Sequence, residues 1–422
     1  SSSAVRPVPC RAAAPSPQIT LSDAMAERSS ILCERAVAVK RAGKRLAAVS
    51  SEARGAWIAD AASVLIEAAG RARKPLADST GLSAEMVDWA VRTTLETCDR
   101  ASLHELHRAA TADGDSAIEM LSIVLAGNLF TASVRAMLVP LLLGVPVLVK
   151  TSSRERMFPT MLAEALRTAD PALAEAVEVV AFPGGDETME AAFLEQASAV
   201  AVYGSDETVS AIRERHRHIP LIAHGHGLSA AYCGREALRT DRAKTTFEAL
   251  ALDIAAYDQR GCLSPQVVYV EAESSSLVEI AERLGRVGLA PLAAQLPRGP
   301  LPIEAGAAQA QWRGLAEATG ALVQGQSFAI AVLDADEPRW SPGYRNVSLV
   351  PVEGPETAAD ALATLGSTLK CVGVDQASAD RACAALATHP ELNAYTCRLG
   401  TMQTPALDAP ADGKPVWHGL LR

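Results

Sequence analysis

Between residues 121 and 225 short apolar runs alternate with helical stretches, and this alternation constrains the fold more than any other feature of the chain. The runs are "LSIVLAG", "VPVLVK", "VEVVAFPGG", "SAVAVYGS" and "IPLIAHG", and helix-like segments separate them. The pattern is typical of βαβ units, in which helices cover both faces of a parallel sheet. It predicts an α/β protein.

The flanking regions extend this prediction. Residues 20–110 are dominated by Ala, Leu, Glu and Arg and contain no strand-like runs, so we expect a helical N-terminal region. After residue 223 a second α/β alternation is predicted. It has a helix over 245–259, further helices over 275–286, 356–366 and 377–387, and strands in "PQVVYVE", "FAIAVLD", "NVSLVPVE", "LKCVGVD" and "NAYTCRL".

These patterns divide the chain into four parts. Residues 1–18 are rich in Ser, Ala and Pro, and we expect them to be disordered. Residues 19–222 hold the helical region and the first α/β domain, and 223–395 the second. We expect residues 396–422 to pack back on the first domain. No Gly/Ser-rich linker separates the two domains, so they are expected to pack closely, with a cleft between them.

Composition excludes several functional classes. A net charge of -10 argues against general nucleic-acid binding. The longest apolar run, residues 137–149, contains two prolines and a glycine and is too short to span a membrane. The eight cysteines form no C-x-x-C pair and no zinc-finger spacing with histidine, so we expect reduced thiols and no metal. No signal-peptide pattern is present, which predicts a cytoplasmic protein.

Small and polar residues gather where the predicted strands of the first domain end, which is where open α/β sheets bind ligands. They are Asn128, Lys150, Thr151, Ser152, Ser153, Arg154, Gly184, Gly185, Gly204, Ser205, His224 and His226. The common G-x-G-x-x-G fingerprint of dinucleotide sites follows none of these strands.

Each group also has a structural interpretation. Asn128 can donate to an oxyanion or cap a helix. Lys150 to Arg154 suit a ribose or phosphate, or form a solvated strand end. Gly204-Ser205 suits a pyrophosphate or an ordinary helix start. His224 and His226 suit acid–base chemistry, or are hydrogen-bonded loop residues.

Cys262 lies in "DQRGCLSP", between a predicted helix and a predicted strand. Gly261 permits close approach of a substrate to the backbone, and Pro265 can fix the turn. Two interpretations stay open from these residues: a small buried thiol, or a nucleophile that needs access and oxyanion donors.

Taken in order, these features resemble the aldehyde dehydrogenase superfamily over about residues 120–400. Lys150 follows Asn128 by 22 residues, Gly204-Ser205 follows 54–55 residues later, and a loop cysteine comes after a Gly-rich strand end. The resemblance implies a Rossmann-type parallel-sheet cofactor domain beside an α/β catalytic domain. It implies that Asn128 helps form the oxyanion hole, Lys150 contacts the adenosine ribose, Gly204 and Ser205 lie by the pyrophosphate, and Cys262 carries the acyl group.

One departure narrows the resemblance. Oxidising members have a Glu-Leu-Gly-Gly-Lys stretch whose Glu activates a hydrolytic water, whereas this chain has His224-Gly225-His226-Gly227-Leu228. An enzyme that exchanges its acyl group with another thiol needs no such water. The stretches "LAGNLF", "VKTSSRE", "AYDQRGCLSPQVVYVE" and "ADGKPVWHGLLR" look like the LuxC-type acyl-CoA reductases (fatty-acid reductases).

This resemblance implies reduction of an acyl-CoA, expected to be fatty acyl, to an aldehyde through a Cys262 thioester. The neutral and cationic residues after Lys150 suit a 2′-phosphate, which favours NADPH over NADH although Glu155 is near. We expect an acyl-CoA or acyl-carrier donor and a homo-oligomer or a partner acyl-transfer subunit. The alternatives are a semialdehyde dehydrogenase that uses a small acyl-phosphate, for which "DQRGCLSP" supplies Arg260 alone, and a non-catalytic acyl-binding partner.

Overall fold

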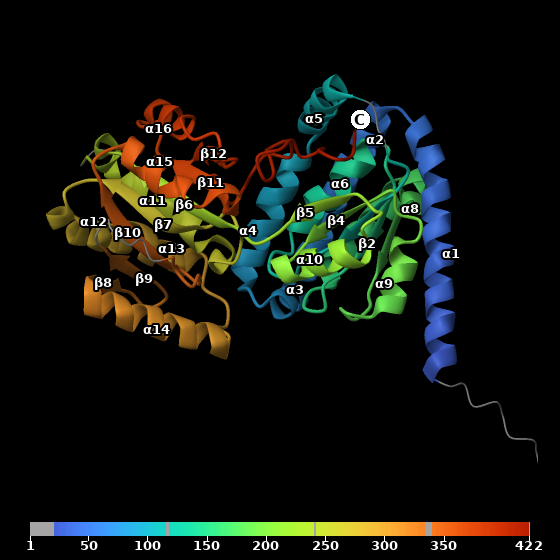
Figure 1. Cartoon of the computed structure of the whole chain (residues 1–422), viewed down its shortest axis with the longest axis horizontal. Coiled ribbons are helices and arrows are strands. Elements are labelled where there is room, and N and C mark those ends of the chain that lie inside the picture. Colours follow the sequence, from blue (N-terminus) through green and yellow to red (C-terminus); the bar gives the residue numbers. More distant parts are fainter. Residues whose placement is uncertain (1–20, 115–117, 240–241, 334–339, 422) are drawn as a thin grey trace, which may run out of the picture.

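The computed structural model of the chain describes residues 21–114, 118–239, 242–333 and 340–421. The predicted disorder of residues 1–18 lies outside these residues. Figure 1 shows two bodies side by side, each built on its own sheet, with α4 between them and the long helix α1 along one outer edge.

The helical N-terminal region is confirmed. It consists of α1 (Leu21–Ala48), α2 (Ser51–Arg71), α3 (Arg73–Thr80), α4 (Ala84–Leu95) and α5 (Arg100–Asp113). Side-chain caps explain where three of these helices begin: Ser50, Ser83 and Asp99 accept first-turn backbone N–H groups of α2, α4 and α5. The apolar faces of α2, α4 and α5 pack into one core with α6 and α7.

The first sheet is five-stranded and wholly parallel, in the order β3-β2-β1-β4-β5. Its strands are β1 (Leu121–Val124), β2 (Val147–Lys150), β3 (Val177–Val180), β4 (Ala199–Tyr203) and β5 (Leu221–His224). The connecting helices are α6 (Ala132–Leu142), α7 (Met157–Ala169), α8 (Pro171–Ala176), α9 (Glu187–Leu194) and α10 (Asp206–Arg215). The strand order reverses between β1 and β4, which is where such sheets bind ligands.

The second sheet is seven-stranded, in the order β12-β11-β6-β7-β10-β9-β8. All its pairings are parallel except that between β8 and β9. The strands are β6 (Leu228–Cys233), β7 (Pro265–Glu271), β8 (Ala321–Gln324), β9 (Ala329–Val332), β10 (Asn346–Val352), β11 (Leu369–Val374) and β12 (Tyr395–Arg398). The helices are α11 (Ala243–Ala255), α12 (Leu277–Arg283), α13 (Ala290–Gln295), α14 (Ile303–Thr319), α15 (Pro355–Ala363) and α16 (Ala379–Leu386).

Several elements differ from the sequence predictions. The helix predicted over 245–259 ends at Ala255, and Tyr257, Asp258 and Gln259 have positive φ values of 52°, 53° and 59°. The helix predicted over 275–286 begins at Leu277 and continues as a π-helical stretch over Leu284–Leu289. The strand β6, the helix α14 and the antiparallel strand β8 were not predicted. Of these, β8 is short and half-exposed, so it has no clear strand pattern.

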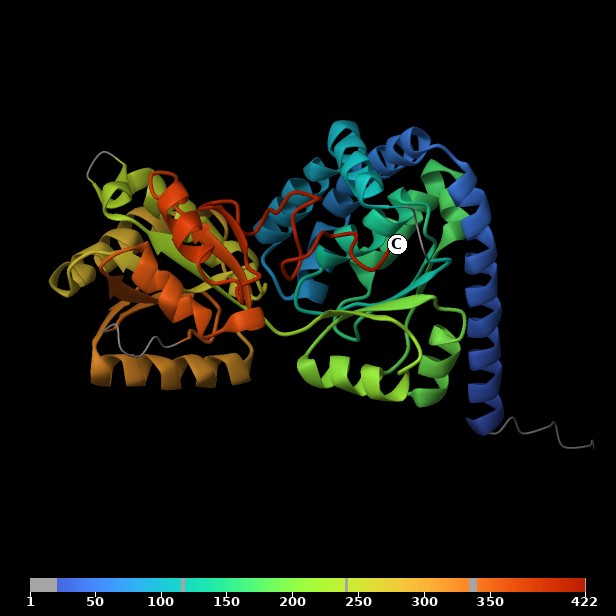
Figure 2. The same ribbon diagram turned by 45° about the horizontal axis from the view of Figure 1, so that its top comes forward.

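The C-terminal segment, residues 399–421, leaves the second sheet after β12 and crosses to the first body, where the C-terminus lies (Figure 2). Leu407, Trp417 and Leu420 of this segment are buried in the core that holds α2, α4 and α6. The segment therefore bridges the two halves of the molecule.

Candidate active site

Cys262 is exposed on the loop between the kinked turn at Ala256–Gln259 and β7. This exposure favours the interpretation of Cys262 as an accessible nucleophile over that of a small buried thiol. The Ser229 hydroxyl at the amino end of β6 donates to the Cys262 carbonyl at 2.6 Å. A Cβ at Gly261 would lie 3.2 Å from Gln403 Oε1, so the glycine allows the C-terminal segment to pack closely beside the nucleophile candidate.

The residues before Cys262 are fixed by buried contacts. Asp258 accepts two hydrogen bonds from Arg345, at 3.0 and 2.7 Å, and both side chains are almost completely buried. Gln259 donates to the carbonyls of Pro265 and Asn346 at 2.8 and 2.7 Å. The Arg260 guanidinium donates to Thr80 O at 2.9 Å, so it reaches the N-terminal helices. The loop is thus held from both halves of the protein.

Asn128 follows β1 and faces this loop. It is not a helix cap: α6 begins after Thr131, and the Asn128 side chain lies three residues earlier. Asn128 Nδ2 instead donates to the carbonyl of Arg260 at 3.2 Å. A side-chain amide from the carboxyl edge of the first sheet is therefore held two residues from Cys262, although the two residues are 134 positions apart in the chain.

Charges of both signs surround the thiol. Desolvation by the surrounding protein raises the pKa of Cys262, and the Asp412 carboxylate raises it further. Lys370 and Arg135 act in the opposite direction, because a nearby cation favours the thiolate. The Nε of Arg135 is buried and has no hydrogen-bond partner among the described residues.

His224, at the end of β5, is held on two sides. Its Nδ1 lies 2.8 Å from Asp412 Oδ2, and its ring stacks on Tyr203 with centroids 4.3 Å apart. Asp412 also accepts a hydrogen bond from Lys370 of β11. Burial would raise the pKa of Asp412, but the hydrogen bonds from His224 and Lys370 outweigh it and leave that pKa below its usual value.

His226 has a different place. It is exposed, and its backbone N–H donates to Asp206 Oδ1 at 3.1 Å. The structure therefore places His224 in contact with Asp412, one of the charged groups that act on Cys262, but gives the His226 side chain no such contact among the described residues.

Lys150 and the residues that follow it lie at the carboxyl edge of the first sheet. Lys150 Nζ lies 4.9 Å from the centroid of the Phe182 ring, and burial lowers the pKa of this lysine. Thr151 is buried, whereas Ser153 and Arg154 are exposed. Ser152 Oγ accepts the Arg154 backbone N–H at 3.1 Å, which fixes the turn.

The glycine sites lie along the same edge. Gly184 and Gly185 are exposed between β3 and α9, Gly185 has a φ of 81°, and a Cβ at either would meet no atom within 4 Å. Ser205 caps α10, with Oγ accepting the Thr208 N–H at 3.4 Å, so the helix-cap interpretation of this turn is confirmed. The carboxyl edge of the first sheet thus combines the exposed backbone of Gly184 and Gly185, the cations Lys150 and Arg154, and the start of α10.

Sequence reasoning missed Asp412, Lys370 and Arg135. The Asp-Gly pair in "ADGK" was a local turn signal, but nothing in the sequence connects Asp412 with a histidine 188 residues earlier. Arg135 lies inside an otherwise apolar helix, which was a signal that its guanidinium needs polar surroundings.

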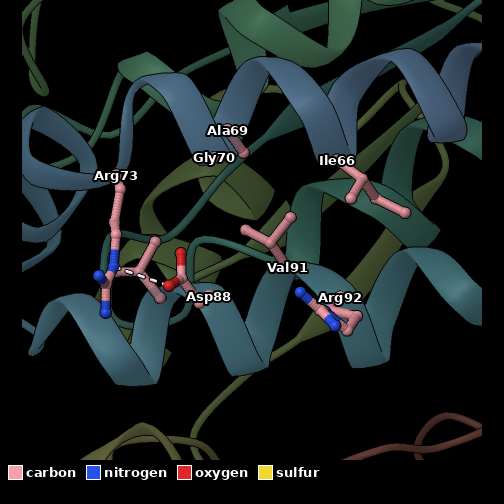
Figure 3. Close-up of a pocket in the computed structure, with 8 residues that line it drawn as sticks. Ile66, Ala69, Gly70, Arg73, Asp88, Val91 and Arg92 are labelled. Carbon is pink, nitrogen blue, oxygen red and sulfur yellow. Dashed lines mark ion pairs between the residues drawn. The ribbon is translucent and has the colours of Figure 1, made fainter.

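A separate pocket lies between α2 and α4 (Figure 3). It is lined by Ile66, Ala69, Gly70, Arg73, Val87, Asp88, Val91 and Arg92, and the ion pair of Arg73 with Asp88, at 2.7 Å, closes one end. None of the predicted site residues lines it.

The fold and the family follow from comparison with known proteins. The structure is similar to aldehyde dehydrogenase 21 from Physcomitrella patens, solved with the product succinate (TM-score 0.70, 15% identity, 91% of this chain and 86% of that one). It is also similar to an NAD-dependent benzaldehyde dehydrogenase from Corynebacterium glutamicum (TM-score 0.66, 15% identity, 89% and 88%). The predicted aldehyde-dehydrogenase-like fold is therefore confirmed. No curated protein matches the chain by sequence.

None of the helices in the described part of the chain combines the length and apolarity that a membrane crossing needs. The model of the acyl-CoA reductase (LuxC) family matches residues 56–414, which is most of the chain. No finding supports the acyl-phosphate alternative. The match covers every residue discussed above as a site candidate, and the chain belongs to the LuxC family of acyl-CoA reductases, enzymes that reduce acyl-CoA to aldehyde.

Proposed function

We propose that the protein reduces fatty acyl-CoA to fatty aldehyde, with Cys262 as the nucleophile and NADPH as the reductant. The observation that carries the assignment of Cys262 is its exposure on a loop whose backbone is hydrogen-bonded to Asn128. A nucleophile and an amide donor are thereby brought together from the two halves, as acyl transfer requires.

The first half-reaction is a thiol exchange. The Cys262 sulfur bonds to the acyl carbon, the carbon–sulfur bond to coenzyme A breaks, and the thiol proton passes to the departing coenzyme A sulfur. Asn128 Nδ2 and the Cys262 backbone N–H are the proposed oxyanion donors. His224 is the candidate for carrying the proton, because Asp412 contacts its Nδ1 and its Nε2 has no partner among the described residues.

The second half-reaction needs a hydride, which the reduced nicotinamide cofactor supplies when bound. The donor set at the carboxyl edge of the first sheet fits such a group. Lys150 and Arg154 are cations, Gly184 and Gly185 leave space above the backbone, and the start of α10 presents N–H groups beside Ser205. The preference for NADPH is supported by Arg154 and by the inward orientation of Glu155.

We propose the cytoplasm as the location. We also propose an acyl-CoA or acyl-carrier donor and assembly with further copies or with an acyl-transfer partner.

The test is oxidation of NADPH by a panel of acyl-CoAs, followed by absorbance, for wild type, Cys262→Ala and Asn128→Ala. We expect C262A to be inactive and N128A to lose about 10²–10³-fold in kcat, the usual loss for one oxyanion donor. Cys383→Ala, which removes an exposed thiol on α16, is the control and should keep full activity. Activity that survives C262A would overturn the proposal. So would a folded wild-type protein that fails to oxidise NADPH with any acyl-CoA of the panel.

A further inference from the structure

Asp412 lies at a tight turn in the C-terminal segment. Ala411 and Lys414 exchange both backbone hydrogen bonds, at 2.8 and 3.0 Å, and Asp412 and Gly413 between them have φ values of 53° and 70°. Two positive φ values are typical of a type I′ turn, which favours the Asp-Gly pair. A Cβ at Gly413 would lie 2.3 Å from Asn393 Cβ, so the turn also needs glycine for space.

The carboxylate at this turn holds one residue from each sheet. His224 comes from the end of β5 in the first sheet, and Lys370 comes from the start of β11 in the second. The three side chains are between 12% and 25% exposed, so solvent screens the ion pair less than it would at the surface.

This group of three lies beside the nucleophile loop. The alkyl chain of Lys370 covers Gly227, where a Cβ would lie 2.2 Å from Lys370 Cγ. In the next residues Cys371 pairs with Ser229 across β11 and β6, and Ser229 holds the Cys262 carbonyl. The amino ends of β6, β7 and β11 thus bring Lys370 and Cys262 to one edge of the second sheet.

We propose that Asp412 and Lys370 are positioning residues for the reaction at Cys262. The carboxylate holds His224 so that Nε2 is free to take the thiol proton, and the ammonium balances the carboxylate beside the sulfur. The inference rests on the proposed role of Cys262 as the nucleophile. It assigns a function to the Asp-Gly turn near the C-terminus, which neither the fold nor the family match assigns.

The ionisable groups that face Cys262 come from three elements. They are the charged Arg135 of α6, Lys370 of β11 and Asp412 of the C-terminal segment, and the neutral thiol of Cys371 in β11. Asp412 also faces Tyr203. Because Asp412 disfavours the thiolate and Lys370 favours it, removing the two charges should change the reactivity of Cys262 in opposite directions. A purely structural role would change it in the same direction for both.

The test measures alkylation of Cys262 by iodoacetamide as a function of pH, with the modified peptide quantified by mass spectrometry. We expect Asp412→Asn to lower the alkylation pKa and to raise the rate at pH 7 about threefold or more, and Lys370→Met to lower that rate by a similar factor. Asn tolerates positive φ, so D412N keeps the turn. Two shifts of the same sign, or none in either variant, would overturn the proposal.

Asp113→Asn is the matched control for docking of the same segment. Asp113 Oδ2 accepts the Trp417 Nε1–H at 2.8 Å, and Trp417 follows Asp412 by five residues in the same segment. D113N should leave the alkylation profile unchanged, and a D113N profile equal to that of D412N would overturn the inference. Alkylation needs no acyl-CoA, so this result stands even if the proposed activity fails. Where acyl-CoA is reduced, D412N should also lower kcat with little change in KM.

Discussion

At the residue scale, Arg154 and Glu155 are neighbours with opposite orientations. Glu155 Oε1 accepts the Phe158 N–H at 2.8 Å at the start of α7, the side chain is buried, and burial raises the pKa of its carboxyl group. Arg154 is exposed, and its backbone is fixed by Ser152 beside Gly127. Glu155, which would repel a 2′-phosphate, is thus turned into the protein. Arg154, which would attract one, faces solvent.

We therefore predict that Arg154→Glu lowers the ratio of kcat/KM for NADPH to that for NADH by about 10- to 100-fold. The estimate follows from about 1.5–3 kcal/mol for hydrogen bonds to a charged group. The measurement is steady-state kinetics with both cofactors. Arg213→Glu, the same charge change at the exposed far end of α10, should leave the ratio unchanged. A ratio that R154E leaves unchanged would contradict the assignment.

At the scale of elements, the loop before Cys262 is strained and is stabilised by its contacts. Tyr257, Asp258 and Gln259 all have left-handed φ, a conformation that costs about 1–2 kcal/mol for each ordinary residue. The opposing contacts are strong: the buried Asp258–Arg345 pair, the Gly299 N–H on Asp258 Oδ2 at 2.9 Å, and Tyr257 OH at 3.0 Å from Thr131. The position of Cys262 thus depends on these contacts.

We predict that Asp258→Asn lowers the free energy of unfolding by about 3–5 kcal/mol, because it leaves the Arg345 charge buried without a partner. Asn keeps the tolerance for positive φ, so the loss reports the charge and not the backbone. Urea denaturation measures it. The exposed pair of Lys74 with Asp78 supplies the control, and Asp78→Asn should cost no more than about 0.5 kcal/mol. Equal losses in the two variants would contradict the argument.

The same loop shows what the sequence could predict. Periodicity located β1 to β5 and the helices between them except α8, because each strand is a short apolar run followed by polar or glycine residues. It extended α11 through Gln259 because "AAYDQ" continues a helical pattern, whereas the turn there is imposed by Arg345, Thr131 and Gly299 from distant parts of the chain. The pairing of His224 with Asp412 could not be predicted from the sequence for the same reason, because it joins distant parts of the chain.

At the scale of the whole molecule, the C-terminal segment connects the two halves through a series of polar contacts. The first is Asp253 of α11, which accepts the N–H groups of Gly400 at 2.6 Å and Met402 at 3.0 Å. Arg135 then donates to Ala409 O, Asp412 joins His224 and Lys370, and Trp417 bonds Asp113. Asp253 is completely buried, and this burial raises its pKa to about 7 despite the two hydrogen bonds.

This raised pKa makes the stability of the segment depend on pH. Between about 4 and 7 the folded protein binds the Asp253 proton more tightly than the unfolded chain, so the free energy of unfolding falls as pH rises through this range. Asp253→Asn removes this dependence. We predict that the melting temperature of D253N minus that of wild type increases as the pH rises from 5 to 8. Asn lacks one of the two acceptor oxygens of Asp, and this loss shifts the difference by a constant amount without changing its trend with pH.

Asp99→Asn provides the control for this measurement. Hydrogen bonds from Ser102 lower the pKa of Asp99, so its carboxylate is ionised throughout pH 5 to 8 in both the folded and the unfolded chain. The difference between D99N and wild type should therefore be constant over that range. A D253N difference that is equally constant would show that Asp253 is ionised at pH 5. The junction of α11 with the C-terminal segment would then be as stable at pH 8 as at pH 5.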